Sequence, residues 1–226
     1  MTGYKFSFTG AALVARGSGA VWWGEHQVLV VSDLHLGKSE RIARLGGAML
    51  PPFETRDTLA RLNSEIMALD PTFVICLGDS FDDLAASAGL ESDAYDCLLQ
   101  MMAGRRWIWI EGNHDPGPVG IGGTHLAAYD IDAVTFRHIA LPGASGEISG
   151  HYHPKAVIKA GGHSISRACF LWDRDRLILP AFGTYTGGLR SDVPELVQLM
   201  RPDALAVLTG PVCRVVPMPG RRFRGT

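Results

Sequence analysis

The sequence lacks several features that would assign it to a membrane, secreted or strongly nucleic-acid-binding class. None of its apolar runs approaches membrane-spanning length, and its first residues contain no basic segment followed by a hydrophobic core. Its 21 basic and 23 acidic residues give a formal net charge of -2. This balance argues against binding nucleic acid through bulk positive charge but allows a local basic surface. We therefore expect a soluble, cytoplasmic protein without a membrane partner.

Cysteine is also scarce. The four cysteines are far apart and form no C-x-x-C pair, so the sequence predicts neither a zinc finger nor a disulfide framework. Cys76 and Cys169 lie in apolar, strand-like runs, which is typical of buried free thiols. No linker, low-complexity segment or internal repeat interrupts the chain. With 226 residues, we expect one domain that covers residues 1–226.

A buried strand predicted at residues 28–31 leads into the first group of chemically active side chains. This run, Val-Leu-Val-Val, is followed by Asp33, His35 and then Gly37. In an extended chain, residues two apart point to the same side, so the carboxylate and the imidazole leave together. Ligands of open α/β sheets bind at the carboxyl ends of strands, so this pair has the position and chemistry of half a metal site.

Three similar groups follow along the chain. Strands predicted at residues 73–77, 107–110 and 146–149 lead into the motifs Gly78-Asp79-x-x-Asp82, Gly112-Asn113-His114-Asp115 and Gly150-His151-Tyr152-His153. Amphipathic helices are predicted over residues 55–69, capped by Thr55, and over 92–103. This alternation predicts parallel central strands covered by helices, and short strands after residue 118 favour antiparallel pairing. We expect an α/β fold with two packed sheets flanked by helices.

The side chains of these motifs suit metal ions. Carboxylate, amide and imidazole groups without thiolate fit Mn²⁺, Fe or Zn²⁺, and the set is larger than one ion needs. Two ions that share a carboxylate would use all of it, and Asp79, on the central strand, is the natural bridge. Such ions lie ~3.5–4 Å apart and act on phosphate esters.

The ordered motifs D-x-H, G-D-x-x-D, G-N-H-D, a lone His and G-H-x-H resemble those of the calcineurin-like metallophosphoesterases. The resemblance implies a four-layer sandwich of two mixed β-sheets flanked by helices. It implies two divalent metal ions, most naturally Mn²⁺, with Fe, Zn²⁺ or Mg²⁺ as alternatives. It distributes the ligands as follows: Asp33, His35 and His153 on one metal, Asn113, His151 and the lone His on the other, and Asp79 between them.

The same resemblance gives His114 a catalytic role without a metal. It implies that His114 contacts the phosphoryl group and helps to protonate the leaving oxygen, and that Asp82 orients His114. For the lone His we favour His138, on a strand predicted over residues 134–140, although Ile139 follows it where the family usually has Gly. The alternative is His125, in a Gly-rich loop.

Basic residues lie near the predicted site. Residues 40–53 predict a loop beside it, because the stretch is polar and Pro51-Pro52 breaks regular structure. Lys38, Arg41 and Arg44 would there either meet a phosphate-bearing substrate or form a solvated charged face. Residues 221–224, Arg-Arg-Phe-Arg, either touch nucleic acid or form a frayed tail.

A narrower resemblance indicates the substrate. Segments around the motifs and residues 179–188, a predicted loop on the substrate side, resemble the bacterial ligase-associated DNA damage response endonucleases. This implies hydrolysis of DNA phosphodiesters in repair, beside an ATP-dependent DNA ligase and a helicase-like protein. That group often has G-D-x-F-H, whereas here Phe81 precedes Asp82. The alternatives are a small-molecule phosphomonoesterase, cyclic-nucleotide phosphodiesterase or pyrophosphatase, and a non-catalytic scaffold. A scaffold would usually have lost a ligand or the motif histidine that this chain keeps.

Overall fold

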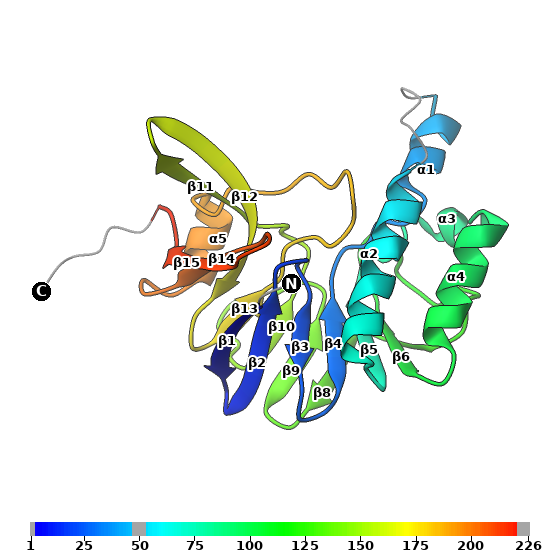
Figure 1. Cartoon of the computed structure of the whole chain (residues 1–226), viewed down its shortest axis with the longest axis horizontal. Helices are drawn as coiled ribbons and strands as arrows, with labels where there is room; N and C mark the ends of the chain where they lie inside the picture. The colour runs from blue at the N-terminus through cyan, green and yellow to red at the C-terminus, as the bar shows by residue number, and fades with distance from the viewer. Residues whose placement is uncertain (1–2, 47–52, 221–226) are drawn as a thin grey trace, which may run out of the picture.

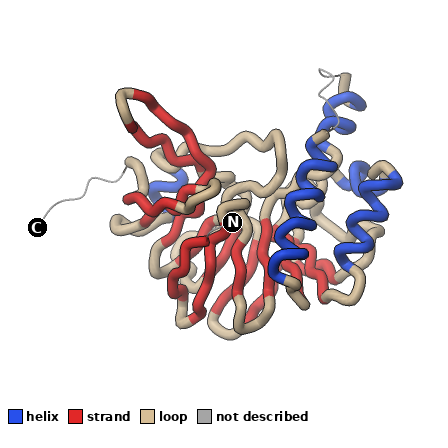
Figure 2. The backbone as a smooth tube through the Cα atoms, in the orientation of Figure 1, coloured by secondary structure: helices blue, strands red, loops and turns tan. Residues whose placement is uncertain are grey.

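The computed structural model describes residues 3–46 and 53–220, so the predictions for Pro51-Pro52 and residues 221–224 lie outside the described residues. Two mixed β-sheets lie face to face, and helices cover their outer sides (Figure 1, Figure 2). No helix within the two described ranges is long and apolar enough to cross a membrane.

The first sheet carries the amino-terminal half of the chain. Among the described residues it has seven strands, ordered in space as in sequence: β1 (Gly3–Phe8), β2 (Ala11–Arg16), β3 (Val21–Trp23), β4 (Val28–Val31), β5 (Phe73–Leu77), β6 (Arg106–Ile110) and β7 (Thr124–Leu126). Strands β1 to β4 pair antiparallel, and β4 to β7 pair parallel. The carboxyl ends of β4, β5 and β6 therefore meet at one edge, as the sequence predicts.

The second sheet is built from the carboxy-terminal half. Its described strands are β8 (Ala128–Ile131), β9 (Val134–Arg137), β10 (Glu147–Ser149), β11 (Lys155–Ala160), β12 (His163–Trp172), β13 (Arg176–Ile178), β14 (Leu205–Leu208) and β15 (Arg214–Pro217). The order is β15-β14-β12-β13-β10-β9-β8, with β11 paired to β12. Strand β10 is parallel to β9 and β13, and the other pairs are antiparallel.

Three apolar cores separate four layers, which confirms the predicted sandwich. The first core lies between the sheets and contains Val30, Ile75 and Phe136. The second joins the first sheet to α2 (Glu54–Leu69) and α4 (Ser92–Met102), and Leu62 and Leu98 are fully buried in it. The third joins the second sheet to α5 (Pro194–Leu199). Fully apolar runs such as β4 become central because both faces of the strand are covered.

The structure corrects the local prediction for residues 40–53. Residues Lys38–Arg44 form helix α1, where the sequence predicts a loop. Helix α2 begins at Glu54, so Thr55 lies inside the helix and not at its cap, and its hydroxyl accepts a hydrogen bond from Gly37 N at 2.9 Å. A short helix α3 (Leu84–Ala88) was also not predicted. These contacts bring α1 to the edge of the sheet where the motif residues lie.

Candidate active site

The motif side chains meet at the carboxyl edge of the parallel strands. Residues 33 and 35 follow β4, residue 79 follows β5, residues 113 and 114 follow β6, residue 138 follows β9, and residues 151 and 153 follow β10. The sequence predicts a strand over residues 134–140 that includes His138, but β9 ends at Arg137, so His138 is the first residue after the strand.

The backbone is in an unusual conformation at these positions. Five of the predicted ligands have positive φ, which is uncommon outside glycine and concentrates at functional sites: Asp33, His35, Asp79, His151 and His153. Each lies in the turn that leaves a strand end, where the chain bends sharply and aims the side chain across the edge of the sheet. The turns account for the convergence of residues from five separate strands.

One cluster of donor atoms consists of Asp33, His35 and His153, whose ligand atoms lie within 4.8 Å of one another. Nδ1 of His35 lies 2.9 Å from Asp82 Oδ1 and donates to it, which leaves the lone pair of Nε2 facing the cluster. Within the described part of the chain, this buried Nε2 has no hydrogen-bond partner. Nε2 of His153 lies 3.0 Å from Asp33 Oδ1. Burial raises the pKa of Asp33, but contacts with His153 and His138 outweigh burial and hold this pKa below its usual value.

A second cluster consists of Asp79, His138 and His151, with Asn113 beside them. Nδ1 of His138 donates to the carbonyl oxygen of Leu77 at 2.8 Å, so Nε2 presents its lone pair. This Nε2 lies 3.0 Å from Asn113 Oδ1, 3.2 Å from His151 Nδ1 and 3.4 Å from Asp79 Oδ2.

The second cluster fits a cation. Around an ion with bonds of about 2.1 Å, neighbouring donor atoms lie about 3.0 to 3.4 Å apart, and the distances from His138 Nε2 fall in this interval. Burial lowers the pKa of His138, but the carboxylates of Asp79 and Asp33 outweigh burial and raise it. The arrangement of acceptor atoms therefore favours positive charge at its centre, as a metal site does.

Asp79 has its own supporting contacts. Its Oδ1 accepts a hydrogen bond from His114 N at 2.8 Å. Burial raises the pKa of Asp79, but His138 and His114 outweigh burial and lower it to about 2. The side chain is 4% exposed, so this carboxylate is held ionised beside the donor atoms of the second cluster.

Asp115 supports the ligand turns and was given no role from the sequence. Its carboxylate accepts backbone N–H bonds from Asp79, Ser80, Phe81 and Gly112 at 2.8 to 3.2 Å. Burial raises the pKa of Asp115 in spite of these bonds. The last position of G-N-H-D was the available signal, but spacing alone does not indicate which amides a carboxylate accepts from.

Two glycines of the motifs allow the close approach of these turns. Gly78 has φ +79°, and a Cβ there would lie 2.5 Å from His138 Nδ1. A Cβ on Gly112 would collide with the backbone nitrogen and Oδ1 of Asp79 and lie 2.6 Å from Asp115 Oδ1. Any larger residue at either position would displace a predicted ligand.

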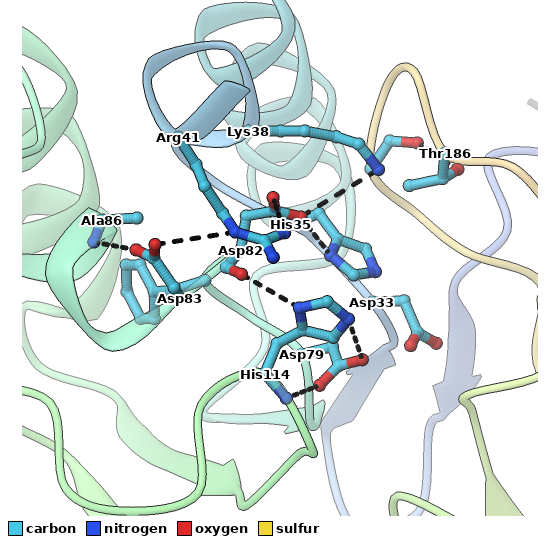
Figure 3. A network of polar contacts seen from close by, with 12 residues as sticks. Asp33, His35, Lys38, Arg41, Asp79, Asp82, Asp83, Ala86, His114 and Thr186 are labelled. Carbon is cyan, nitrogen blue, oxygen red and sulfur yellow. Dashed lines mark hydrogen bonds and ion pairs between the residues drawn. The ribbon is translucent and has the colours of Figure 1, made fainter. Parts of the chain in front are cut away.

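His114 lies beside the clusters and faces solvent in part. Its side chain is 32% exposed, and its Nε2 lies 4.0 Å from Asp79 Oδ2 (Figure 3). Its Nδ1 donates to the main-chain carbonyl oxygen of Asp82 at 3.0 Å. The ring is therefore oriented with Nε2 toward the carboxylate of Asp79.

Asp82 contacts His114 through its main-chain carbonyl oxygen. Its carboxylate accepts hydrogen bonds from His35 Nδ1 at 2.9 Å and from Arg41 Nη1 at 3.0 Å, with Lys38 Nζ at 4.0 Å (Figure 3). Burial raises the pKa of Asp82, but His35 and Arg41 outweigh burial and lower it to about 2. The physical reason is charge: two cations from α1 and a ring N–H attract the carboxylate, and the carbonyl remains for His114.

Lys38 and Arg41 lie beside the site because both face the carboxylate of Asp82, whereas Arg44 is paired with Asp83 at 2.8 Å.

His125 lies away from both donor clusters. It is on β7, stacks on Trp109, and its Nε2 lies 3.4 Å from Val119 N. Of the two candidates for the lone histidine, the structure places only His138 among the other predicted ligands.

Comparisons with known proteins identify the family of the chain. The sequence model for the calcineurin-like phosphoesterase family matches residues 26–183, well over half of the chain. The structure is similar to the crystal structure of the nuclease MPE of Pseudomonas putida, with a TM-score of 0.72 and 25% sequence identity, over 92% of this chain and 96% of that chain. No curated protein matches the chain significantly. The chain therefore belongs to the calcineurin-like phosphoesterase family and is a metal-dependent phosphoric ester hydrolase.

Proposed function

We propose that the protein is a dinuclear metal-dependent phosphodiesterase that cuts DNA. The observation that carries the proposal is the pair of neighbouring donor clusters, Asp33–His35–His153 and Asp79–His138–His151. Asn113 would complete the ligands of the second ion, and Asp79 would be the carboxylate shared by both ions. The donors are oxygen and nitrogen atoms without thiolate, which supports Mn²⁺ as the bound ion.

When two divalent cations are bound, they polarise the phosphoryl oxygens and make water a better nucleophile at neutral pH. The protein's own side chains supply the remaining chemistry. In its doubly protonated form, His114 gives the Nε2 proton to the leaving oxygen while Nδ1–H donates to the carbonyl of Asp82. Lys38 and Arg41 attract the non-bridging oxygens of the substrate, since their side chains are only partly buried, 24% and 33% exposed.

The nuclease neighbour and the resemblance to ligase-associated repair endonucleases support DNA as the substrate. The proposed setting is DNA repair in the cytoplasm, together with an ATP-dependent DNA ligase and a helicase. A second candidate is a small-molecule phosphoesterase that acts on monoesters, cyclic nucleotides or pyrophosphates. It is favoured by the formal net charge of -2, which gives little general attraction for a polyanion.

Substrate comparison tests the proposal. Hydrolysis of bis(p-nitrophenyl) phosphate and p-nitrophenyl phosphate is measured with and without Mn²⁺, followed by single-stranded and nicked DNA. We expect Mn²⁺-dependent hydrolysis that is faster for the diester than for the monoester, and we expect cleavage of DNA. Faster turnover of the monoester without DNA cleavage would favour the small-molecule function, and no hydrolysis of either ester would contradict a phosphoesterase. The His125→Ala variant serves as a control, because His125 lies outside both clusters.

A further inference from the structure

A basic cavity lies next to the candidate active site but outside it. It has a volume of about 530 Å³ and lies between the turn at residues 17–19, the loop at residues 183–186 and the turn at residues 209–211. Its charged lining residues are Arg61 and Lys155, and no carboxylate lines it within the described residues. This distribution contrasts with the formal net charge of -2 for the whole chain.

A second cavity continues the first. It has a volume of about 300 Å³ and shares Thr209, Gly210 and Pro211 with the first cavity. Its charged lining residues are Arg167 on β12 and Arg214 on β15, again without a carboxylate in the described part of the chain. We call the two adjoining cavities the basic groove. It follows the hairpin β11–β12, which projects from the body of the molecule (Figure 1).

The groove adjoins the predicted ligands through the loop at residues 183–186. Gly183 N, in the loop that lines the groove, donates to Asp33 O at 3.0 Å. Lys155 follows His153 by two residues, and its Nζ lies 3.4 Å from Thr186 O. Figure 3 shows Thr186 on the same side of the site as Lys38. A polymer bound across the metal site can therefore continue into the groove.

The cations of the groove differ in the contacts that they make within the protein. Lys155, Arg167 and Arg214 form no ion pair with any residue that the structure describes. Arg61 donates to the carbonyl oxygens of Phe182 and Ser18 and holds the loop in place, whereas Lys155 makes one contact of this kind, to Thr186 O. Charges left unpaired along one path attract an extended anion.

An exposed aromatic ring lies at the active-site end of the groove. Tyr185 is 50% exposed and lines the first cavity. Its φ of 59° is unusual for a bulky residue, so the surrounding loop holds the ring at this position against local strain. A ring beside a row of cations is the combination by which proteins bind single-stranded nucleic acid: bases stack on the ring and phosphates meet the cations.

We propose that the basic groove binds a single strand of DNA that flanks the phosphodiester at the metal site. The inference rests on the proposed DNA substrate and assigns residues to its recognition. Lys155, Arg167 and Arg214 meet successive phosphates, and Tyr185 stacks on a base. A duplex fits less well, because its bases are paired inside and cannot stack on Tyr185.

Binding to the metal-free protein tests the groove without catalysis. Fluorescence anisotropy of a labelled oligothymidylate of about 12 nucleotides is measured in EDTA at several salt concentrations. For the double variant Arg167→Ala/Arg214→Ala, we expect weaker binding and a salt slope of log K reduced by about 1.4, at about 0.7 per phosphate of single-stranded DNA. The matched control Lys5→Ala/Arg174→Ala removes two exposed cations outside the groove, and we expect its affinity and slope to match the wild type.

Stacking is tested separately. Tyr185→Ala should weaken binding on the order of 10-fold with little change in salt slope, and Tyr185→Trp should restore it. Thermal unfolding measured by circular dichroism checks that all variants fold. If the arginine and tyrosine variants bind the oligonucleotide as tightly as the controls, the groove is not the binding site for the strand. Equal affinity of the wild type for a duplex of the same length would overturn the single-strand assignment.

The two proposals can fail independently. If the wild type cleaves DNA but the groove variants bind the oligonucleotide as tightly as the wild type, only the proposed role of the groove is contradicted. Groove-dependent binding by a protein that, loaded with Mn²⁺, cleaves no DNA would contradict the proposed function and support the groove.

Discussion

Replacing Asp82 distinguishes two roles that its position in the sequence does not separate. In the structure its carboxylate accepts from His35 Nδ1 at 2.9 Å, whereas His114 is held by the main-chain carbonyl of the same residue. Asp82→Asn keeps the size of the side chain and the carbonyl contact, and it removes the charge that fixes the tautomer of His35. We therefore expect Asp82→Asn to affect metal binding and to leave the orientation of His114 intact.

The size of the effect follows from the role of a residue behind a metal ligand. Loss of such a partner costs roughly 10- to 100-fold in metal affinity, equivalent to about 1.4–2.7 kcal/mol. The side chain of Asp82 is 2% exposed, so water cannot easily replace it beside His35. Asp82→Ala should cost more, because it leaves the buried Nδ1 of His35 without its acceptor and removes the ion pair with Arg41.

Two measurements test this reasoning. Calorimetric titration of the metal-free variants with Mn²⁺ gives the affinity, and we expect one of two binding steps to weaken. Turnover at saturating Mn²⁺ is then compared on two diesters, one with a nitrophenol and one with a poor leaving group. The ratio of the two rates should equal that of the wild type. A changed ratio with unchanged metal affinity would refute the reasoning and show that the carboxylate acts on His114.

Three further variants probe the assigned roles. Asp79→Asn should weaken both metal sites in calorimetric titration, because a bridging carboxylate serves two cations; unchanged occupancy at both would exclude the bridge. His138→Ala should lose one metal by elemental analysis, whereas His125→Ala, on the outer strand β7, should lose none, and the opposite result would transfer the ligand role. His114→Ala should keep both metals and lose on the order of 10²–10⁴ in rate, with a smaller loss on nitrophenyl esters, since such groups leave without a proton; an equal loss on both substrates would contradict its role as an acid.

Sequence predicted the layers and the convergence of the motifs because both depend on strong local patterns. The apolar runs of β4, β5 and β6 are buried, and side chains that follow parallel strands meet at one edge. The sequence favours His138 over His125 because His138 lies on a predicted strand close before Gly150-His151. In each case a short stretch of chain contains the information, and the rest of the fold only brings the stretches together.

The sequence predictions differ from the structure where contacts with residues distant in the sequence determine the local conformation. Helix α1 has no apolar stripe that periodicity could detect. It is held by a hydrogen bond from Ser39 N to Glu54 Oε1 at 2.8 Å and by the contact of Arg41 with the carboxylate of Asp82. The contact from Arg41 also explains why the Asp82 carboxylate points away from His114. Thr55 does not cap α2 because the helix already begins at Glu54. Spacing within a motif indicates which residues are near one another. It does not indicate which of several cations a carboxylate selects.

The four amide bonds to Asp115 have a consequence for motion within the active site. One carboxylate joins the turn after β5, with Asp79, to the turn after β6, with Asn113, because it accepts from amides of both. Neither turn can detach while the other stays closed without leaving a buried carboxylate short of partners. The two turns therefore form a single cooperative unit for local unfolding, and their amide hydrogens exchange with solvent through one shared opening rather than through two independent ones.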